Sequence, residues 1–203
     1  TGIDLNGGTF RLNSASSMQS VETIGDLTVS KGGQITLART NAGSTTLRVG
    51  ALTNTVNGTL QLNPSGANTL GIPASNPTLF DRLITTSVLT LTGTTTNGLG
   101  VVNSGLAPVW IVDATANSFV GYDTMGIGSG FQTLQSSGTP GIGQIEYSNR
   151  ITAAGAFTTA ALTDGTATVD ISSVQTLGVG YNPSVYALRT SSSITPDAAG
   201  NRL

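Results

Sequence analysis

The chain has no cysteine and no histidine, and only 9% of its 203 residues carry a charge. The absence of cysteine excludes disulfides and thiolate chemistry, and the two absences together remove the commonest ligands of zinc. Without histidine, no side chain has an ordinary pKa that changes its charge between about pH 5 and 8. We therefore expect neither a cofactor nor a metal, and we do not expect an enzyme.

The chain also has no large excess of charge of either sign. It contains eight lysines and arginines and ten acidic residues, for a net charge of -2, and the basic residues are scattered rather than clustered. Such a balance argues against a nucleic-acid partner, because phosphate binding needs a basic surface. No apolar run reaches the roughly 18 residues of a membrane span, and no leader pattern is present, so we expect no membrane span in this segment.

Hydroxyl groups take the place of the missing charges. The chain contains 33 threonines and 21 serines, so hydroxyl groups supply the polar surface that charged side chains usually supply. Threonine is β-branched and fits a pleated surface, which favours strands. This composition is typical of long secreted β proteins.

A short strand phrase recurs along the first third of the chain. In each copy apolar residues stand at positions i and i+2, so they lie on one face of a strand while threonine, arginine or glutamine points to the other. This alternation predicts an all-β protein. The phrases span residues 8–12, 25–29, 34–37, 46–49 and 58–62.

Glycine-containing turns separate these phrases, at residues 6–8, 31–33 and 57–58. Two architectures share this spacing: a parallel β-solenoid, in which each coil pairs with the next, and an antiparallel β-sandwich or jelly roll joined by hairpins. Asn57-Gly58 is a preferred hairpin pair. The connections are nevertheless uneven in length, which favours a solenoid, because its loops can differ freely.

The pattern predicts one continuous β-solenoid segment over residues 1–203. Prolines at 64, 73 and 77 interrupt it, so residues 63–87 are expected to form a loop excursion. Residues 113–150 are rich in glycine and aromatics and are expected to be irregular. Because no polar cap follows residue 184, we expect the segment to belong to a longer protein.

Residues 21–29 (VETIGDLTV) and residues 45–57 form two successive strand phrases. The first is similar to the opening of the autotransporter-associated β-strand repeats of giant bacterial surface proteins, and the second to the strand that follows it. Residues 109–113 and 117–123 resemble its tryptophan-containing phrase, although Pro108-Val109 and Ser118 depart from it. A third likeness joins residues 162–168 to residues 185–188.

The resemblance implies a right-handed parallel β-helix that is exported to the bacterial cell surface. It implies a structural or adhesive role in a surface or filament protein, and it carries no catalytic residues. Partners on this view are further copies of the chain, neighbouring repeats of the same chain, or glycans and host surfaces. A rigid rod that assembles end to end is the expected function.

A carbohydrate-binding or polysaccharide-degrading β-helix is the alternative. Trp110, Tyr122 and Tyr147 are its candidate glycan contacts, since sugar rings stack on exposed aromatic faces. The same aromatics also suit a packing cluster. An enzyme of this kind needs two close carboxylates; the later acidic residues are expected to be lone surface groups, and they are Asp113, Asp123, Glu146, Asp164 and Asp170.

The adjacent charges Asp81 and Arg82 follow the proline segment. An arginine beside acidic groups also occurs in β-helical lyases, which need several converging carboxylates. Only one carboxylate is present here, so we interpret the two residues as a surface ion pair of little energetic consequence.

Overall fold

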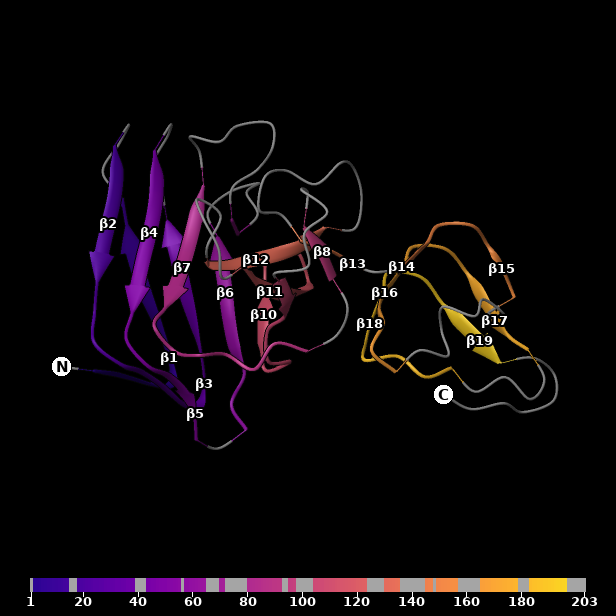
Figure 1. Cartoon of the computed structure of the whole chain (residues 1–203), viewed down its shortest axis with the longest axis horizontal. Coiled ribbons are helices and arrows are strands. Elements are labelled where there is room, and N and C mark those ends of the chain that lie inside the picture. Colours follow the sequence, from indigo (N-terminus) through magenta and orange to yellow (C-terminus); the bar gives the residue numbers. More distant parts are fainter. Residues whose placement is uncertain are drawn as a thin grey trace.

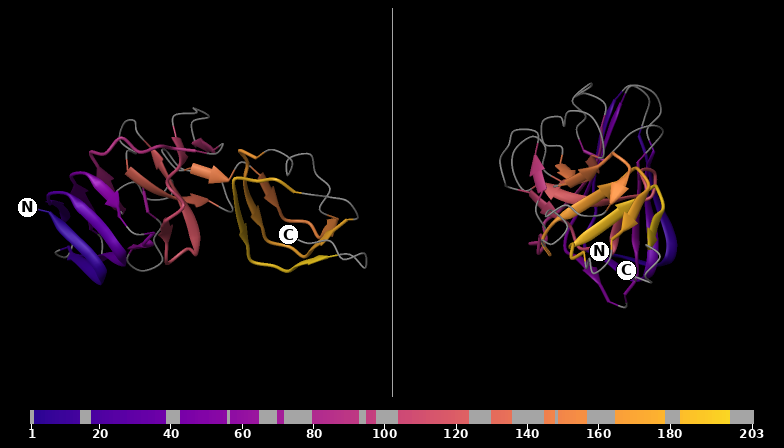
Figure 2. Two further views of the ribbon diagram at one scale, coloured as in Figure 1. Left: turned by 90° about the horizontal axis from the view of Figure 1, so that it is seen from below. Right: turned by 90° about the vertical axis from the view of Figure 1, so that its right-hand side faces the viewer.

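The fold is all-β. No helix occurs among the residues that the computed structural model describes, and none of that part of the chain offers a helical membrane span. Figures 1 and 2 show an elongated arrangement, with the N-terminal strands at one end of the long axis and the C-terminal sheets at the other. The described residues are 2–14, 18–38, 43–55, 57–64, 70–71, 80–92, 95–97, 104–123, 130–135, 145–147, 149–156, 165–178 and 183–196.

The first part of a ten-stranded sheet is parallel throughout. Strand β3 pairs with β1 on one side and with both β5 and β6 on the other, and β6 pairs onward with β10. Register partners in the first three layers lie about 25 residues apart along the chain. The bounds are Ile3–Asn13 (β1), Leu27–Ala38 (β3), Leu52–Asn54 (β5), Leu60–Pro64 (β6) and Ile111–Asp113 (β10).

A second, three-stranded parallel sheet faces the first (Figure 1). Its central strand pairs with both outer strands, and Glu22, Leu47 and Leu83 fall in one register column. Each of its strands follows in sequence after a strand of the first sheet. The bounds are Gln19–Thr23 (β2), Ser44–Val49 (β4) and Asp81–Thr85 (β7).

Glycines bend the long strands without ending them. Gly7 and Gly32 have φ angles of 84° and 96°, values that glycine adopts easily because it has no Cβ. Strands β1 and β3 therefore continue through residues that the sequence suggested as turns. Asn57, with a φ of 51°, also lies at a corner: the strands on either side of it both pair parallel with β3, so it does not close a hairpin.

Antiparallel pairs interrupt the parallel pattern in the middle of the chain. Strand β11 runs antiparallel to β9, β10 and β12, and β13 runs antiparallel to β8 and parallel to β12. The sheet is therefore mixed, and parallel pairing does not run unbroken from end to end. The bounds are Thr95–Asn97 (β8), Ser104–Leu106 (β9), Ser118–Asp123 (β11), Gly130–Gln135 (β12) and Ile145–Tyr147 (β13).

Two small parallel sheets form the C-terminal part. Their register partners lie about 20 residues apart, a shorter repeat than in the N-terminal part. One sheet holds Asn149–Ile151 (β14), Thr168–Ile171 (β16) and Ala187–Thr190 (β18), and the other holds Gly155–Ala156 (β15), Gln175–Leu177 (β17) and Ile194–Pro196 (β19).

Apolar side chains gather in three clusters. The largest lies between the N-terminal sheets, and its members include Leu27, Val29 and Leu60. The C-terminal sheets enclose a smaller one around Val169 and Ile171. A third cluster, which includes Leu106, Leu134, Tyr147 and Ala187, joins the two parts.

Two sections expected to be irregular contain strands. Strand β7 lies within residues 63–87. The sequence does not reveal it, because two of its three inward positions, Asp81 and Thr85, are polar and hide the alternation. Strands β11, β12 and β13 and the start of β14 lie within residues 113–150. Much of the proline segment, including residues 65–69 and 72–79, lies outside the described residues.

Candidate functional site

The three predicted glycan-contact aromatics do not form one exposed platform. Tyr122 is 6% exposed and Tyr147 is 4% exposed. Trp110 is partly buried against the N-terminal cluster, to which Tyr122 also belongs, whereas Tyr147 lies in the cluster that joins the two parts. Neither tyrosine ring presents a face on which a sugar could stack.

The two tyrosines have structural partners. The Tyr122 ring packs edge-to-face on Phe131, with ring centres 4.8 Å apart, and its hydroxyl donates to the Thr85 carbonyl and accepts from the Thr85 N–H. The Tyr147 hydroxyl lies 2.8 Å from the Ser118 hydroxyl. Burial raises the pKa of both phenols, so they remain neutral hydrogen-bonding groups.

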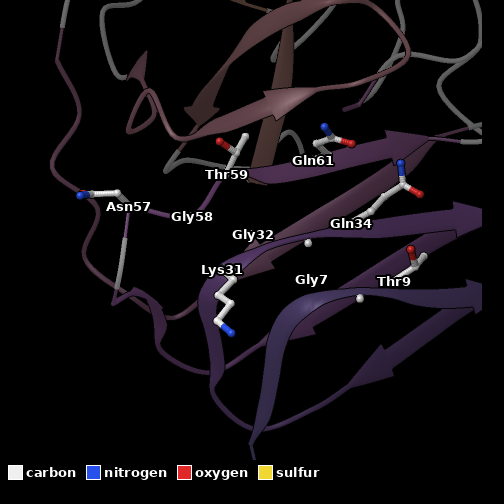
Figure 3. Close-up of a pocket in the computed structure, with 11 residues that line it drawn as sticks. Gly7, Thr9, Lys31, Gly32, Gln34, Asn57, Gly58, Thr59 and Gln61 are labelled. Carbon is white, nitrogen blue, oxygen red and sulfur yellow. The ribbon is translucent and has the colours of Figure 1, made fainter.

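A shallow polar groove follows the glycine corners of three successive layers (Figure 3). Its volume is about 510 Å³, and Gly7, Gly32 and Gly58 contribute to its lining. Gln34 pairs in register with Thr9 on one side and Gln61 on the other. This column gives one wall of the groove a run of amide and hydroxyl groups that can exchange hydrogen bonds with an uncharged polar ligand, and Lys31 also lines the groove. We call this feature the glycine-corner groove.

The sequence did not identify this groove. The sequence predicts turns at the three corners and places the polar residues on the solvent side of the strands. The available signal was the spacing of about 25 residues between successive glycine corners, which places them side by side only when the strands are stacked in parallel.

Asp113 is a buried carboxylate whose pKa is shifted by its surroundings. It is 1% exposed and pairs in register with Leu62, at the end of an apolar column. One carboxylate oxygen accepts from the N–H groups of Thr115 and Ala116, both at 2.9 Å, and the other accepts from the Thr133 hydroxyl. Burial raises the pKa of Asp113, although these hydrogen bonds oppose the rise.

Asp113→Asn should show the raised pKa of Asp113 as a pH-dependent difference in unfolding free energy between wild type and variant. Because the folded-state pKa is raised, the folded protein binds the proton more tightly than the unfolded chain does. The carboxyl group therefore adds stability at low pH, and this is lost as pH rises above about 3.9 and through the folded pKa. We expect the difference in unfolding free energy to move in favour of the wild type as pH falls. Urea unfolding of both proteins across this range measures it, and a difference that moves toward the variant would contradict the assignment.

The other carboxylates are also structural. Asp123 and Asp170 are 3% and 2% exposed, so the expectation of lone surface groups is wrong for them and for Asp113. The Glu146 side chain and Asp164 lie outside the described residues. In the described part of the chain, no three acidic side chains gather in a group that could hold a metal ion.

The surface interpretation of Asp81 and Arg82 is wrong as well. Asp81 has no exposed area, because it occupies an inward position of β7. The Arg82 guanidinium lies 5.1 Å from the centre of the Phe80 ring, within the range of a cation–π contact. Burial and the nearby charge of Arg48 lower the pKa of Arg82.

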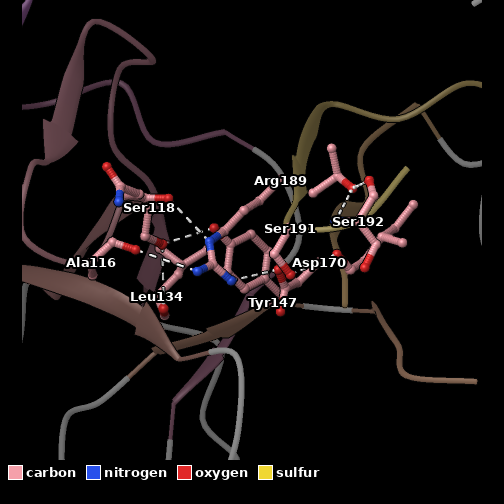
Figure 4. A network of polar contacts seen from close by, with 11 residues as sticks. Ala116, Ser118, Leu134, Tyr147, Asp170, Arg189, Ser191 and Ser192 are labelled. Carbon is pink, nitrogen blue, oxygen red and sulfur yellow. Dashed lines mark hydrogen bonds and ion pairs between the residues drawn. The ribbon is translucent and has the colours of Figure 1, made fainter. Parts of the chain in front are cut away.

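Arg189 joins the C-terminal sheets to the rest of the protein (Figure 4). Its guanidinium lies 2.7 Å from the Asp170 carboxylate on the neighbouring strand. It also donates to the Asn117 carbonyl at 3.1 Å and to the Ala116 carbonyl at 3.4 Å, in the turn after β10. A hydrogen bond between the Thr92 and Tyr186 hydroxyls adds a second link across the same junction.

Comparisons of the chain with protein-family models, with curated proteins and with solved structures each found no match.

Proposed function

We propose that this chain is a structural, non-catalytic rod: a right-handed parallel β-helix, interrupted by antiparallel strands, in a bacterial cell-surface or extracellular filament protein. The observation that carries the proposal is the parallel register of the N-terminal sheets. Ile3 faces Leu27, which faces Leu52, so one circuit of the chain returns to the same side of the molecule after about 25 residues.

Burial between layers supplies the stability of such a rod. The Phe10 column continues through Ile35 and Leu62, and the second and third of these are 1% exposed. Burying a large apolar side chain contributes about 1.5–3 kcal/mol. Main-chain hydrogen bonds join each layer to the next, so an inner layer is stabilised from both sides.

Surface localisation is supported by composition and resemblance. Hydroxyl-rich strands, the absence of cysteine and the low charge suit a protein that works outside the cell, and the repeat-like phrases at residues 21–29 and 117–123 point the same way. The proposed partners are further copies of the chain or neighbouring repeats of a longer one. No cofactor is needed for this role.

Small-angle X-ray scattering of the 203-residue chain tests the proposal. A compact domain of this length has a radius of gyration of about 17 Å. We expect a clearly larger value for the monomer and a distance distribution with a long tail, as a rod gives. A monomer with the compact value and a symmetric distribution would overturn the rod.

The glycine-corner groove favours a second candidate function, the binding of a neutral glycan. Its polar wall can exchange hydrogen bonds with sugar hydroxyls, and carbohydrate binding on a β-helix does not require the buried tyrosines.

Gln34→Ala combined with Gln61→Ala should then abolish most binding to a neutral polysaccharide. Each lost hydrogen bond between neutral groups is worth about 0.5–1.5 kcal/mol, so the pair should weaken binding about tenfold. Affinity electrophoresis through gels that contain the polysaccharide measures this. Thr53→Ala, an exposed change outside the groove, is the control, and equal retardation of all three proteins would exclude the groove.

A further inference from the structure

Strand β1 is the first strand of the ten-stranded sheet, and among the described residues it is paired along one edge only, with β3. It is 11 residues long. An edge of this kind has main-chain N–H and C=O groups that can pair with another chain.

The corner at Gly7 and Gly8 divides β1 into two arms with the same order of side-chain types. Read outward from the corner, each arm has a polar residue, an apolar one, a charged one and another apolar one. The charges are opposite, Asp4 on one arm and Arg11 on the other. The arms are Asn6, Leu5, Asp4 and Ile3 on one side, and Thr9, Phe10, Arg11 and Leu12 on the other.

Burial follows the same symmetry. Ile3, Phe10 and Leu12 are partly buried and pack on the N-terminal cluster, and Leu5 is a member of it at 4% exposed. Asp4 and Arg11 are exposed on the opposite face. The inward face of β1 is thus apolar on both arms, and its outward face is charged on both arms.

The bend of β1 allows a two-fold partner. Gly7 has a φ of 84°, and the pairing of β1 with β3 shifts register around it, so the two arms pair with β3 as separate segments. A two-fold axis through the corner exchanges the arms and reverses the strand direction. A second copy placed by this axis brings its own β1 antiparallel to the first along both arms.

We propose that two copies of the chain pair head to head through β1, in an antiparallel register that sets Ile3 opposite Leu12, Asp4 opposite Arg11 and Leu5 opposite Phe10. Each of these pairs then occurs twice, because the interface is isologous. Opposite charges and apolar residues directly across an antiparallel ladder both favour pairing. This inference rests on the proposed rod, since it says how such rods join.

The C-terminal strands that the structure describes fit β1 poorly, which argues against a head-to-tail fibre. Strands β18 and β19, at the C-terminal edges of their sheets, have four and three residues, against 11 in β1. Arg189 of β18 is engaged by Asp170. The head-to-head contact closes on itself, so the product is a dimer.

Charge reversal gives a sharp test. Asp4→Arg places two like-charged pairs in the interface, and so does Arg11→Asp. Each change should weaken dimerisation at least about tenfold, since every pair changes from attraction to repulsion. The double variant Asp4→Arg/Arg11→Asp should restore it. A mixture of the two single variants should form a mixed dimer, because all of its cross-strand charges are again opposite.

Sedimentation equilibrium of the 203-residue chain, from micromolar to near-millimolar concentration, measures these masses. Arg48→Asp, an exposed reversal on β4, is the matched control and should leave the dimer unchanged. Far-ultraviolet circular dichroism identifies any variant that does not fold, and the double variant still tests the register if one single variant fails to fold.

A wild type that stays monomeric, a mass that grows beyond two copies, or a dimer indifferent to both single reversals would overturn the proposal. These results are distinguishable from failure of the rod. A monomer with an elongated scattering profile rejects the head-to-head contact alone, whereas a compact monomer rejects the rod itself.

Discussion

Leu47→Ala should lower the unfolding free energy by about 2–5 kcal/mol. Leu47 has no exposed area and stands in register with Leu83 on the next strand. Truncation removes apolar contacts within the layer of Leu47 and with the next layer. Strand β4 is hydrogen-bonded to β2 and to β7, which limits how far the main chain can collapse into the cavity. The loss is a large fraction of the stability of a domain, so it should be evident in equilibrium unfolding.

Urea unfolding monitored by circular dichroism measures the loss. Val88→Ala is the matched control, because Val88 is fully exposed and its truncation should change stability by less than about 0.5 kcal/mol. Equal midpoints for wild type and Leu47→Ala would mean that this column is not part of a packed interior.

Arg189→Met should destabilise the C-terminal sheets by about 3 kcal/mol. The change keeps most of the apolar stem but removes the charge, and Asp170, whose side chain is 3% exposed, is left without its cation. Removing one partner of a buried pair typically costs about 3–5 kcal/mol, and the partial exposure of Arg189 places this case at the lower end. The two hydrogen bonds to the Asn117 and Ala116 carbonyls are lost as well.

Native-state hydrogen exchange locates the effect. Amides of β16 and β18 should exchange faster in Arg189→Met, while those of β3 and β4 should keep their protection. The double variant Asp170→Asn/Arg189→Met should recover much of the loss, because no unpaired charge remains. A double variant no more stable than Arg189→Met would show that the ion pair is not the cause.

The sequence predicts strands best where every inward position is apolar. In β1 and β3 the residues Phe10, Leu12, Leu27 and Val29 alternate with polar ones, so the period of two is plain. What the alternation does not reveal is that each strand continues past its glycines. A positive φ at Gly7 serves a bend as well as a turn, and only the pairing partner decides between them.

Sequence patterns fail where burial depends on partners distant in the chain. Asp113 and Asp170 are charged by type and were expected at the surface, but turn N–H groups satisfy the first and Arg189 the second. The antiparallel strands between residues 95 and 147 likewise depend on distant pairings. Short local alternation cannot specify strand direction.

The roles of the candidate site residues also depend on partners that are distant in the chain. Aromatic residues are equally suited to a sugar platform and to a core, and burial assigns Tyr122 and Tyr147 to the core. The glycine-corner groove arises from residues that are about 25 positions apart and unremarkable one by one. Its polar wall exists only because the layers are in register.

Cysteine cross-linking across one layer tests the central claim most directly. The chain has no cysteine of its own, and the Thr28 and Thr53 hydroxyl oxygens on adjacent parallel strands lie 3.3 Å apart. Thr28→Cys/Thr53→Cys should form an intramolecular disulfide on mild oxidation, whereas Thr28→Cys/Gln61→Cys, which pairs positions from different register columns, should keep both thiols open to alkylation. The stacked parallel register predicts this contrast. A first pair that stays reduced while the second cross-links would contradict it.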